Sequence, residues 1–250
     1  MRILKTFVQL ILLVSIIVFG VGYFKRDTLP QKEQILDSLY QKPLQEEIKE
    51  PWFEVSKDGV SYKIYPKYDY QFYGLIVTQY NSENWLDISH KEDPLNTKDI
   101  CAVWGNNLKT GIYQEAKFSH GEFTCFWRFK KSDGTFSPSE ISNSHLLPAN
   151  DQVYQKIKES QVGDQVYFKG YLADYAVITQ QGELRRTTSI TRNDTGNGAC
   201  EVVYVTDFQI LKKTDSIFPL FYKYSKYVIV ISLIFLIILF IMPSDYKEEF

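Results

Sequence analysis

A cysteine and a histidine, with two possible partners for the histidine, could perform covalent catalysis. Cys200 lies in TRNDTGNGACE and His145 in SNSHLLP. In cysteine hydrolases a histidine takes the proton of the thiol, and a carboxylate or amide orients the ring. These residue types predict a candidate hydrolase site of Cys200, His145 and Asp194, with Asn143 as the alternative orienting residue. The hypothesis requires a partly exposed Cys200 within hydrogen-bonding reach of His145.

The loop before Cys200 contains the triplet Asp194-Thr195-Gly196, which aspartic proteases use. That chemistry needs two carboxylates that share one proton, and the chain has no second copy of the triplet. Glycine and asparagine around it tolerate positive φ, so a tight turn explains the stretch better than catalysis does. We therefore expect a rigid loop bordered by charged binding candidates or bracing residues, namely Arg192, Asp194 and Glu201.

The histidines and cysteines show no spacing that is typical of a metal site. Neither Cys-x-x-Cys nor His-x-x-x-His occurs in the sequence, so we expect no metal and no cofactor. The residues considered are His90, His120, His145, Cys101, Cys125 and Cys200.

A disulfide between Cys101 and Cys125 is the favoured structural interpretation of two of the three cysteines. The two residues fall in neighbouring predicted strands, and closing their loop would add on the order of 3 kcal/mol in an oxidising compartment. Three connectivities are open, and reduced buried thiols fit the sequence about as well.

Two long apolar segments near the chain ends predict transmembrane helices. Residues 6–24 are uncharged and would span roughly 28 Å as a helix, which favours a signal anchor; a cleaved signal peptide is the alternative. Residues 227–243 form the second span, which Pro243 ends. An aromatic and basic juxtamembrane segment at 213–226 precedes it, and a short cytoplasmic tail at 244–250 follows.

The topology is predicted from the first span rather than from charge counts. Lysine and arginine flank both sides of the spans, and long loops cross membranes largely regardless of charge. A short basic head before an apolar run is typical of export signals. We therefore expect an integral protein of a bacterial inner membrane, with both termini in the cytoplasm and residues 25–226 outside.

The region between the spans predicts a stalk followed by one β-rich domain. Residues 25–51 are charged and carry spaced apolar residues, which favours a helical stalk. Residues 52–212 are rich in aromatic residues, many in short alternating runs bounded by turn residues, which predicts a small barrel or sandwich-like domain with one short helix near Asn150. The domain is long enough to bury a core.

The C-terminal third of this domain resembles an OB-type barrel in architecture. Residues 145–211 read as a strand, the short helix, and then three further strands. The three strands after the helix depart from the OB pattern, so the resemblance does not imply oligonucleotide binding.

Composition narrows the function without naming it. The formal charge of −2 over 250 residues gives no net basic field for nucleic acid. The spans carry almost no polar residues, which argues against a transport path through them. The sequence therefore favours a binding or assembly module for a membrane or envelope protein, and the cysteine hydrolase is the alternative.

Overall fold

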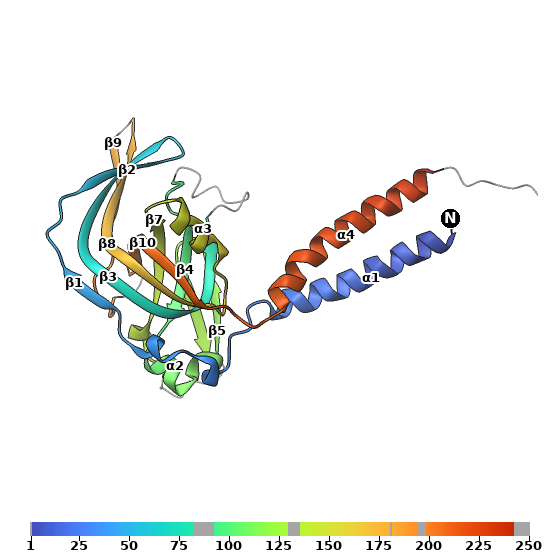
Figure 1. Ribbon diagram of the computed structural model, residues 1–250, viewed down its shortest axis with the longest axis horizontal. Coiled ribbons are helices and arrows are strands. Elements are labelled where there is room, and N and C mark those ends of the chain that lie inside the picture. Colours follow the sequence, from blue (N-terminus) through green and yellow to red (C-terminus); the bar gives the residue numbers. More distant parts are fainter. Residues whose placement is uncertain (1, 83–92, 130–135, 181, 195–198, 243–250) are drawn as a thin grey trace, which may run out of the picture. The chain divides into compact units, whose positions relative to one another are not determined.

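The computed structural model describes residues 2–82, 93–129, 136–180, 182–194 and 199–242 (Figure 1). The chain divides into two compact units. One comprises residues 1–28 and 215–250, and the other comprises residues 29–214.

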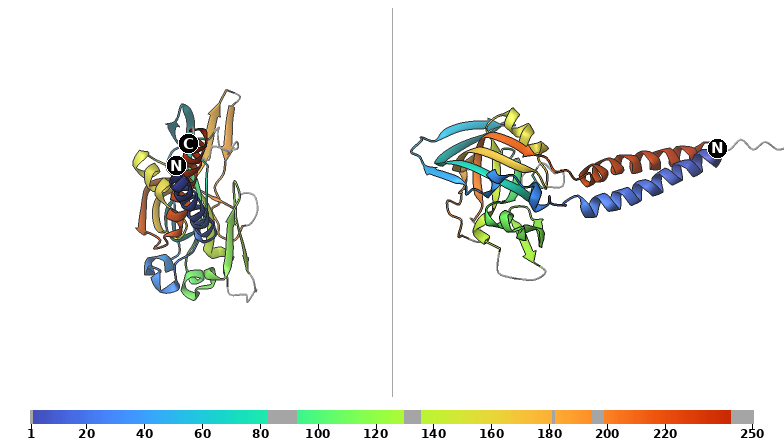
Figure 2. Two further views of the ribbon diagram at one scale, coloured as in Figure 1. Left: turned by 90° about the vertical axis from the view of Figure 1, so that its right-hand side faces the viewer. Right: turned by 60° about the horizontal axis from the view of Figure 1, so that its bottom comes forward.

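The first unit is a pair of long apolar helices, α1 (Arg2–Lys25) and α4 (Phe218–Ile241), which lie side by side (Figures 1 and 2). Both are long and apolar enough to cross a membrane. A Cβ on Gly22 would lie 2.6 Å from the backbone nitrogen of Tyr222, so glycine permits the close approach of the two backbones. Near this close approach, the centroids of the Phe19 and Tyr222 rings lie 5.4 Å apart.

The second helix begins earlier than the sequence suggested. It starts at Phe218, so most of the expected juxtamembrane segment 213–226 is helical. Pro219 stands in the first turn, where its missing N–H costs nothing and its fixed φ suits a helix. The aromatic and basic residues after it are compatible with helical backbone, and they therefore continue the apolar helix rather than precede it.

The second unit is mainly β, as the sequence predicts, and is built on an eight-stranded mixed sheet. Two further strands form a separate hairpin sheet. The strands of the large sheet are β1 (Leu44–Glu47), β2 (Phe53–Lys57), β3 (Val60–Asn81), β4 (Lys98–Val103), β7 (Ile141–Pro148), β8 (Gln165–Thr179), β9 (Gly182–Arg186) and β10 (Glu201–Lys212). The hairpin consists of β5 (Ala116–His120) and β6 (Cys125–Phe129).

Five strands of the large sheet close into a ring. The order β3-β4-β7-β10-β8 returns to β3 through a long antiparallel ladder between β3 and β8. All neighbours in the ring are antiparallel except β7 and β10, which are parallel. The predicted short helix is present between β7 and β8 as α3 (Asp151–Glu159). Asn150 caps it by accepting from the Val153 amide at 3.0 Å.

Alternation along the strands separates two layers of apolar side chains. The inner layer fills the ring and includes Ile100, Leu146 and Val203, against which Ile157 of α3 packs. The outer layer forms two further clusters, one around Leu75 and Tyr113 and one around Tyr62 and Tyr175. The outer faces of β4, β7 and β10 run between these clusters.

The helical stalk expected at residues 25–51 is not formed. Leu39 is fully buried, and the Gln165 side chain accepts from the Leu36 amide and donates to the Gln34 carbonyl, both at 2.8 Å. The segment thus satisfies its backbone against the sheet instead of within a helix. Its elements are η1 (Lys32–Gln34), η2 (Asp37–Tyr40) and strand β1, which pairs with β3.

Three short helical turns between strands complete the described part of the unit. One is helix α2 (Asn106–Thr110), and Glu140 accepts from the Asn107 amide in its first turn at 3.1 Å. The others are η3 (Ile112–Gln114) and η4 (Pro138–Glu140).

Candidate active site

The strand register brings three chemically active side chains onto one face of the sheet. Asp99 of β4 lies directly opposite His145 of β7, and His145 lies opposite Val202 of β10. Cys200 directly precedes β10, two residues before Val202, and its sulfur interacts electrostatically with His145. Residues far apart in the sequence therefore meet because their strands are neighbours in the ring.

Asp99 holds the ring of His145. The Nδ1 atom of His145 lies 2.7 Å from Oδ1 of Asp99, and the Asp99 side chain is fully buried. Burial lowers the pKa of His145, but the charge and hydrogen bond of Asp99, together with the neighbouring Cys200 thiol, raise that pKa to about 10. The Asp99 carboxylate therefore favours the protonated, imidazolium form of His145.

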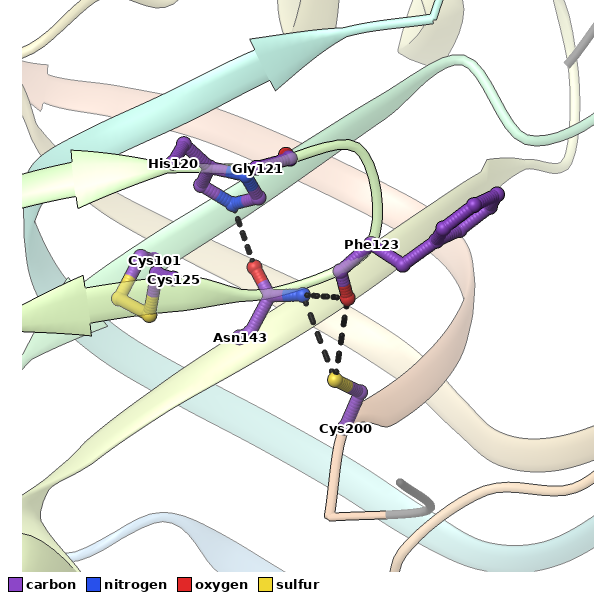
Figure 3. The surroundings of a disulfide bond; sticks show 7 residues. All are labelled: Cys101, His120, Gly121, Phe123, Cys125, Asn143 and Cys200. Atoms are coloured by element: carbon purple, nitrogen blue, oxygen red, sulfur yellow. Dashed lines mark hydrogen bonds between the residues drawn. A yellow bond between two sulfur atoms is a disulfide. The ribbon is translucent and has the colours of Figure 1, made fainter. Parts of the chain in front are cut away.

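Cys200 meets one of the two conditions that the hydrolase hypothesis sets. Its side chain is partly exposed, but the contacts of the described residues include no hydrogen bond between its thiol and the His145 ring, although the sulfur is near enough to raise the pKa of that ring. Its Sγ atom also lies 3.4 Å from the carbonyl oxygen of Phe123, to which it donates, and 3.4 Å from Nδ2 of Asn143 (Figure 3). The thiol is thus held by the Phe123 carbonyl and the Asn143 amide, and it interacts electrostatically with the His145 ring.

Asn143 contacts the Cys200 thiol and the His120 ring. Its Nδ2 group donates to the Phe123 carbonyl at 3.1 Å as well as to Sγ of Cys200. Its Oδ1 atom lies 2.7 Å from Nε2 of His120, whose Nδ1 lies 2.6 Å from the Gly121 carbonyl (Figure 3). Both ends of the amide are therefore fixed, and its N–H group points at the sulfur.

The favoured cysteine pair is joined in the structure. The sulfur atoms of Cys101 and Cys125 lie 2.07 Å apart, and the bond ties β6 to β4 (Figure 3). Cys125 lies opposite His120 in the hairpin ladder. The disulfide consequently anchors the hairpin that carries His120 at the end of β5 and Phe123 in its turn, and the Phe123 carbonyl contacts the Cys200 thiol.

Asp194 does not fill the role that the sequence suggested. Its Oδ2 atom accepts from Ser189 Oγ at 2.6 Å, while Asp99 is the carboxylate bound to His145. Thr195 and Gly196 lie outside the described residues. The signal for Asp99 was an acidic residue inside the strand KDICAV, a position that needs a partner when it is buried.

Arg192 and Glu201 brace the loop from the opposite face. Arg192 Nη1 lies 2.8 Å from Oε1 of Glu201, and its Nη2 donates to Tyr70 Oη at 3.2 Å. Burial raises the pKa of Glu201 to about 7, although the Arg192 guanidinium acts in the opposite direction. Arg192 and Glu201 therefore form an ion pair across the loop, at a position where the carboxylate is buried.

A cavity of about 850 Å³ opens beside Cys200. Residues 124–127 of the hairpin form one wall, the start of β7 forms a second, and loop residues 191–194 form a third. Phe126 and Trp127 expose aromatic surface to it, while Asn143 and Cys200 supply polar groups. A volume of this size is typical of sites for small molecules or substrate segments.

The described residues contain no group of three or more histidine, cysteine or acidic side chains arranged to hold a metal ion. His90 lies outside these residues. No protein-family model, curated protein or solved structure matches the chain.

Proposed function

We propose that the β-rich unit is a cysteine-dependent acyl hydrolase or acyltransferase. Cys200 is the nucleophile, His145 the acid and base, and Asp99 the residue that orients and charges the ring. The observation that carries the proposal is the buried Asp99–His145 pair, whose ring interacts electrostatically with a partly exposed thiol beside a cavity. The same three roles recur in unrelated cysteine hydrolases, where geometry defines them.

The first half of the reaction forms a thioester. In the reactive form the proton of the thiol resides on His145, and the thiolate of Cys200 attacks the carbonyl carbon of an ester, thioester or amide. The Asn143 amide, 3.4 Å from Sγ, is placed to donate to the oxyanion that forms. As the tetrahedral adduct collapses, the bond to the leaving group breaks, and His145 gives that group its proton.

The second half releases the acyl group. Neutral His145 now takes a proton from water or an acceptor alcohol or amine, whose lone pair attacks the thioester carbonyl. The bond between carbon and Sγ breaks, and the sulfur leaves as thiolate beside the restored imidazolium. Asp99 keeps its contact with Nδ1 of His145 throughout and stabilises the charged ring.

We further propose that α1 and α4 anchor this unit in a bacterial inner membrane, with both termini in the cytoplasm and residues 25–226 outside. The length and apolar surface of both helices support insertion, and the Cys101–Cys125 bond supports an oxidising compartment. An impermeant maleimide should label Cys200 in intact cells without prior reduction. Labelling that appears only after lysis would reverse the topology.

We also propose that the five-stranded ring is of the OB type. Three features support this: the spatial order of the strands, the helix α3 between β7 and β8, which are the third and fourth ring strands along the chain, and the single parallel pair of β7 and β10. OB barrels bind ligands on the face of their second and third strands. Asp99, Asn143 and His145 lie on the corresponding strands, β4 and β7.

Turnover of a simple acyl ester tests the catalytic proposal. The full chain in detergent should release more than one p-nitrophenol per chain from p-nitrophenyl acetate and carry an acetyl group on Cys200. Cys200→Ser should lose both, and His145→Gln should be slower by about 100-fold. Equal rates for wild type and His145→Gln would show that the thiol merely reacts nonspecifically.

A binding module without chemistry is the second candidate, and exposed Phe126 and Trp127 favour it because aromatic surface is common in recognition sites. In that case a partner of the membrane or envelope should bind Cys200→Ala as tightly as wild type, and no acylated Cys200 should be found. Turnover that depends on Cys200 would exclude it.

A further inference from the structure

The walls of the cavity are the edges of two strands. Residues 124–127 all line it, and so do residues 141–143. Successive side chains of a strand point to opposite faces, so a cavity that meets every residue in a row faces the strand's edge. The backbone of both stretches is therefore presented to whatever fills the cavity.

Both edges lack a neighbouring strand within the part of the chain that the structure describes. β6 pairs with β5 alone. β7 pairs with β4 along Ile141–Leu146, but its ladder with β10 begins only at Ser144 and Glu201. Residues 141–143 consequently have a strand on one side and the cavity on the other.

We propose that the substrate is an extended polypeptide segment that binds as an added strand between these two edges. The inference rests on the proposed acyl-transfer function and names the substrate class. Exposed strand edges bind extended peptides through the main chain, and side-chain pockets supply selectivity. We call the space between the edges at residues 124–127 and 141–143 the peptide track. The catalytic groups adjoin this track, because Asn143 belongs to the β7 edge and also contacts the Cys200 sulfur.

The side chains at the track indicate which peptides bind. Phe126 and Trp127 are neighbours in sequence, so they face opposite sides of β6, and both are partly exposed at the cavity. They offer apolar contacts to successive residues of the bound strand. An uncharged hexapeptide rich in leucine and phenylalanine, about 20 Å long when extended, is the matching probe.

Binding to an inactive variant tests the inference separately from catalysis. The full-length Cys200→Ser chain in nanodiscs is titrated into a fluorescent hexapeptide, and anisotropy is recorded. Two derivatives carry N-methyl groups on one or the other alternating set of amides. Each should bind at least tenfold more weakly, because one set faces β6 and the other faces β7. Trp127→Ala should weaken binding, whereas Trp52→Ala, at an exposed tryptophan that does not line the cavity, should not.

The outcomes separate the two proposals. Equal affinity of the methylated and unmethylated peptides, or no binding by a variant whose circular dichroism matches wild type, would overturn the added-strand inference. Turnover of small esters without peptide binding would do so too, while leaving acyl transfer intact. Peptide binding without any acylation of wild-type Cys200 would overturn the catalytic proposal and leave the peptide site standing.

Discussion

Asp99 and His145 face each other across the β4–β7 ladder, with Oδ1 and Nδ1 2.7 Å apart. A fully buried carboxylate is costly unless a cation or donors compensate it. The imidazolium supplies both charge and a hydrogen bond, and its other side adjoins the Cys200 thiol. One cross-strand pair thus fixes the orientation of the ring and favours its protonated form next to Cys200, which lines the cavity.

Asp99→Asn should reduce the nucleophilicity of Cys200. Without the carboxylate the ring loses the main group that raises its pKa, and the imidazolium beside the thiol is no longer favoured. We expect iodoacetamide to alkylate Cys200 about tenfold more slowly at pH 7, measured by intact mass in the full chain. Asp207→Asn, at a half-exposed carboxylate paired with Lys156, is the control and should leave the rate unchanged. Equal rates in both variants would contradict the role of Asp99.

His145 should make stability depend on alkaline pH. Its folded pKa of about 10 lies above its ordinary value of 6.5, so its contribution is fully present below pH 6.5 and is lost as pH rises through 10. Relative to His145→Gln, the wild-type free energy of unfolding should fall by up to about 1.4 kcal/mol per pH unit in this window. Urea titrations followed by tryptophan fluorescence at several pH values measure the difference. A difference that stays constant across the window would rule out the raised pKa.

The disulfide should support both the fold and the site. Cys101 and Cys125 are 24 residues apart, and a bond that closes such a loop contributes about 3 kcal/mol. The double variant Cys101→Ser with Cys125→Ser should lose a similar amount of unfolding free energy. It should also slow alkylation of Cys200, because the hairpin that carries His120 and Phe123 loses its covalent anchor. An unchanged alkylation rate in a folded double variant would show that the disulfide does not affect the reactivity of Cys200.

The sequence was sufficient for the parts of the fold that depend on local pattern. The two apolar helices, the β-rich unit and α3 follow from hydropathy, alternation and the Asn150 cap. The prediction of a helical stalk was wrong. Leu36 and Leu39 have the spacing of a helix face, but the backbone there forms its hydrogen bonds with the Gln165 side chain instead of within a helix. Local spacing does not reveal a partner more than a hundred residues away.

The same distinction applies to the candidate site. Cys200 and His145 could be proposed from residue type alone, but the carboxylate that completes the chain depends on register. Asp99 reaches His145 only because β4 and β7 pair with these residues opposite each other. Asp194, close to Cys200 in sequence, is instead held by Ser189. Nearness in sequence was a poorer guide than strand order.

Gly170→Ala should destabilise the five-stranded ring of the sheet where β8 pairs with β10. A Cβ on Gly170 would lie 1.9 Å from the carbonyl oxygen of Tyr204, which is backbone and cannot move aside cheaply. We expect a loss of more than about 2 kcal/mol in unfolding free energy by urea titration. Gly121→Ala is the control, since its new Cβ would meet no atom closer than 3.4 Å. Equal stability of the two variants would show that the strands separate easily at this crossing.

Glu201 tests whether burial or the ion pair with Arg192 determines the pKa of a buried carboxylate. Its folded pKa of about 7 lies above the ordinary 4.5 because burial outweighs Arg192, whose Nη1 lies 2.8 Å away. A raised pKa means that the contribution of Glu201 to stability is fully present below pH 4.5 and is lost as pH rises through 7. Relative to Glu201→Gln, wild-type unfolding free energy should therefore fall between these values, by on the order of 3 kcal/mol. Glu159→Gln, at an exposed residue ending α3, provides the reference for nonspecific charge effects. If the wild type instead gains stability over Glu201→Gln as pH rises, attraction to Arg192 dominates the desolvation of the carboxylate.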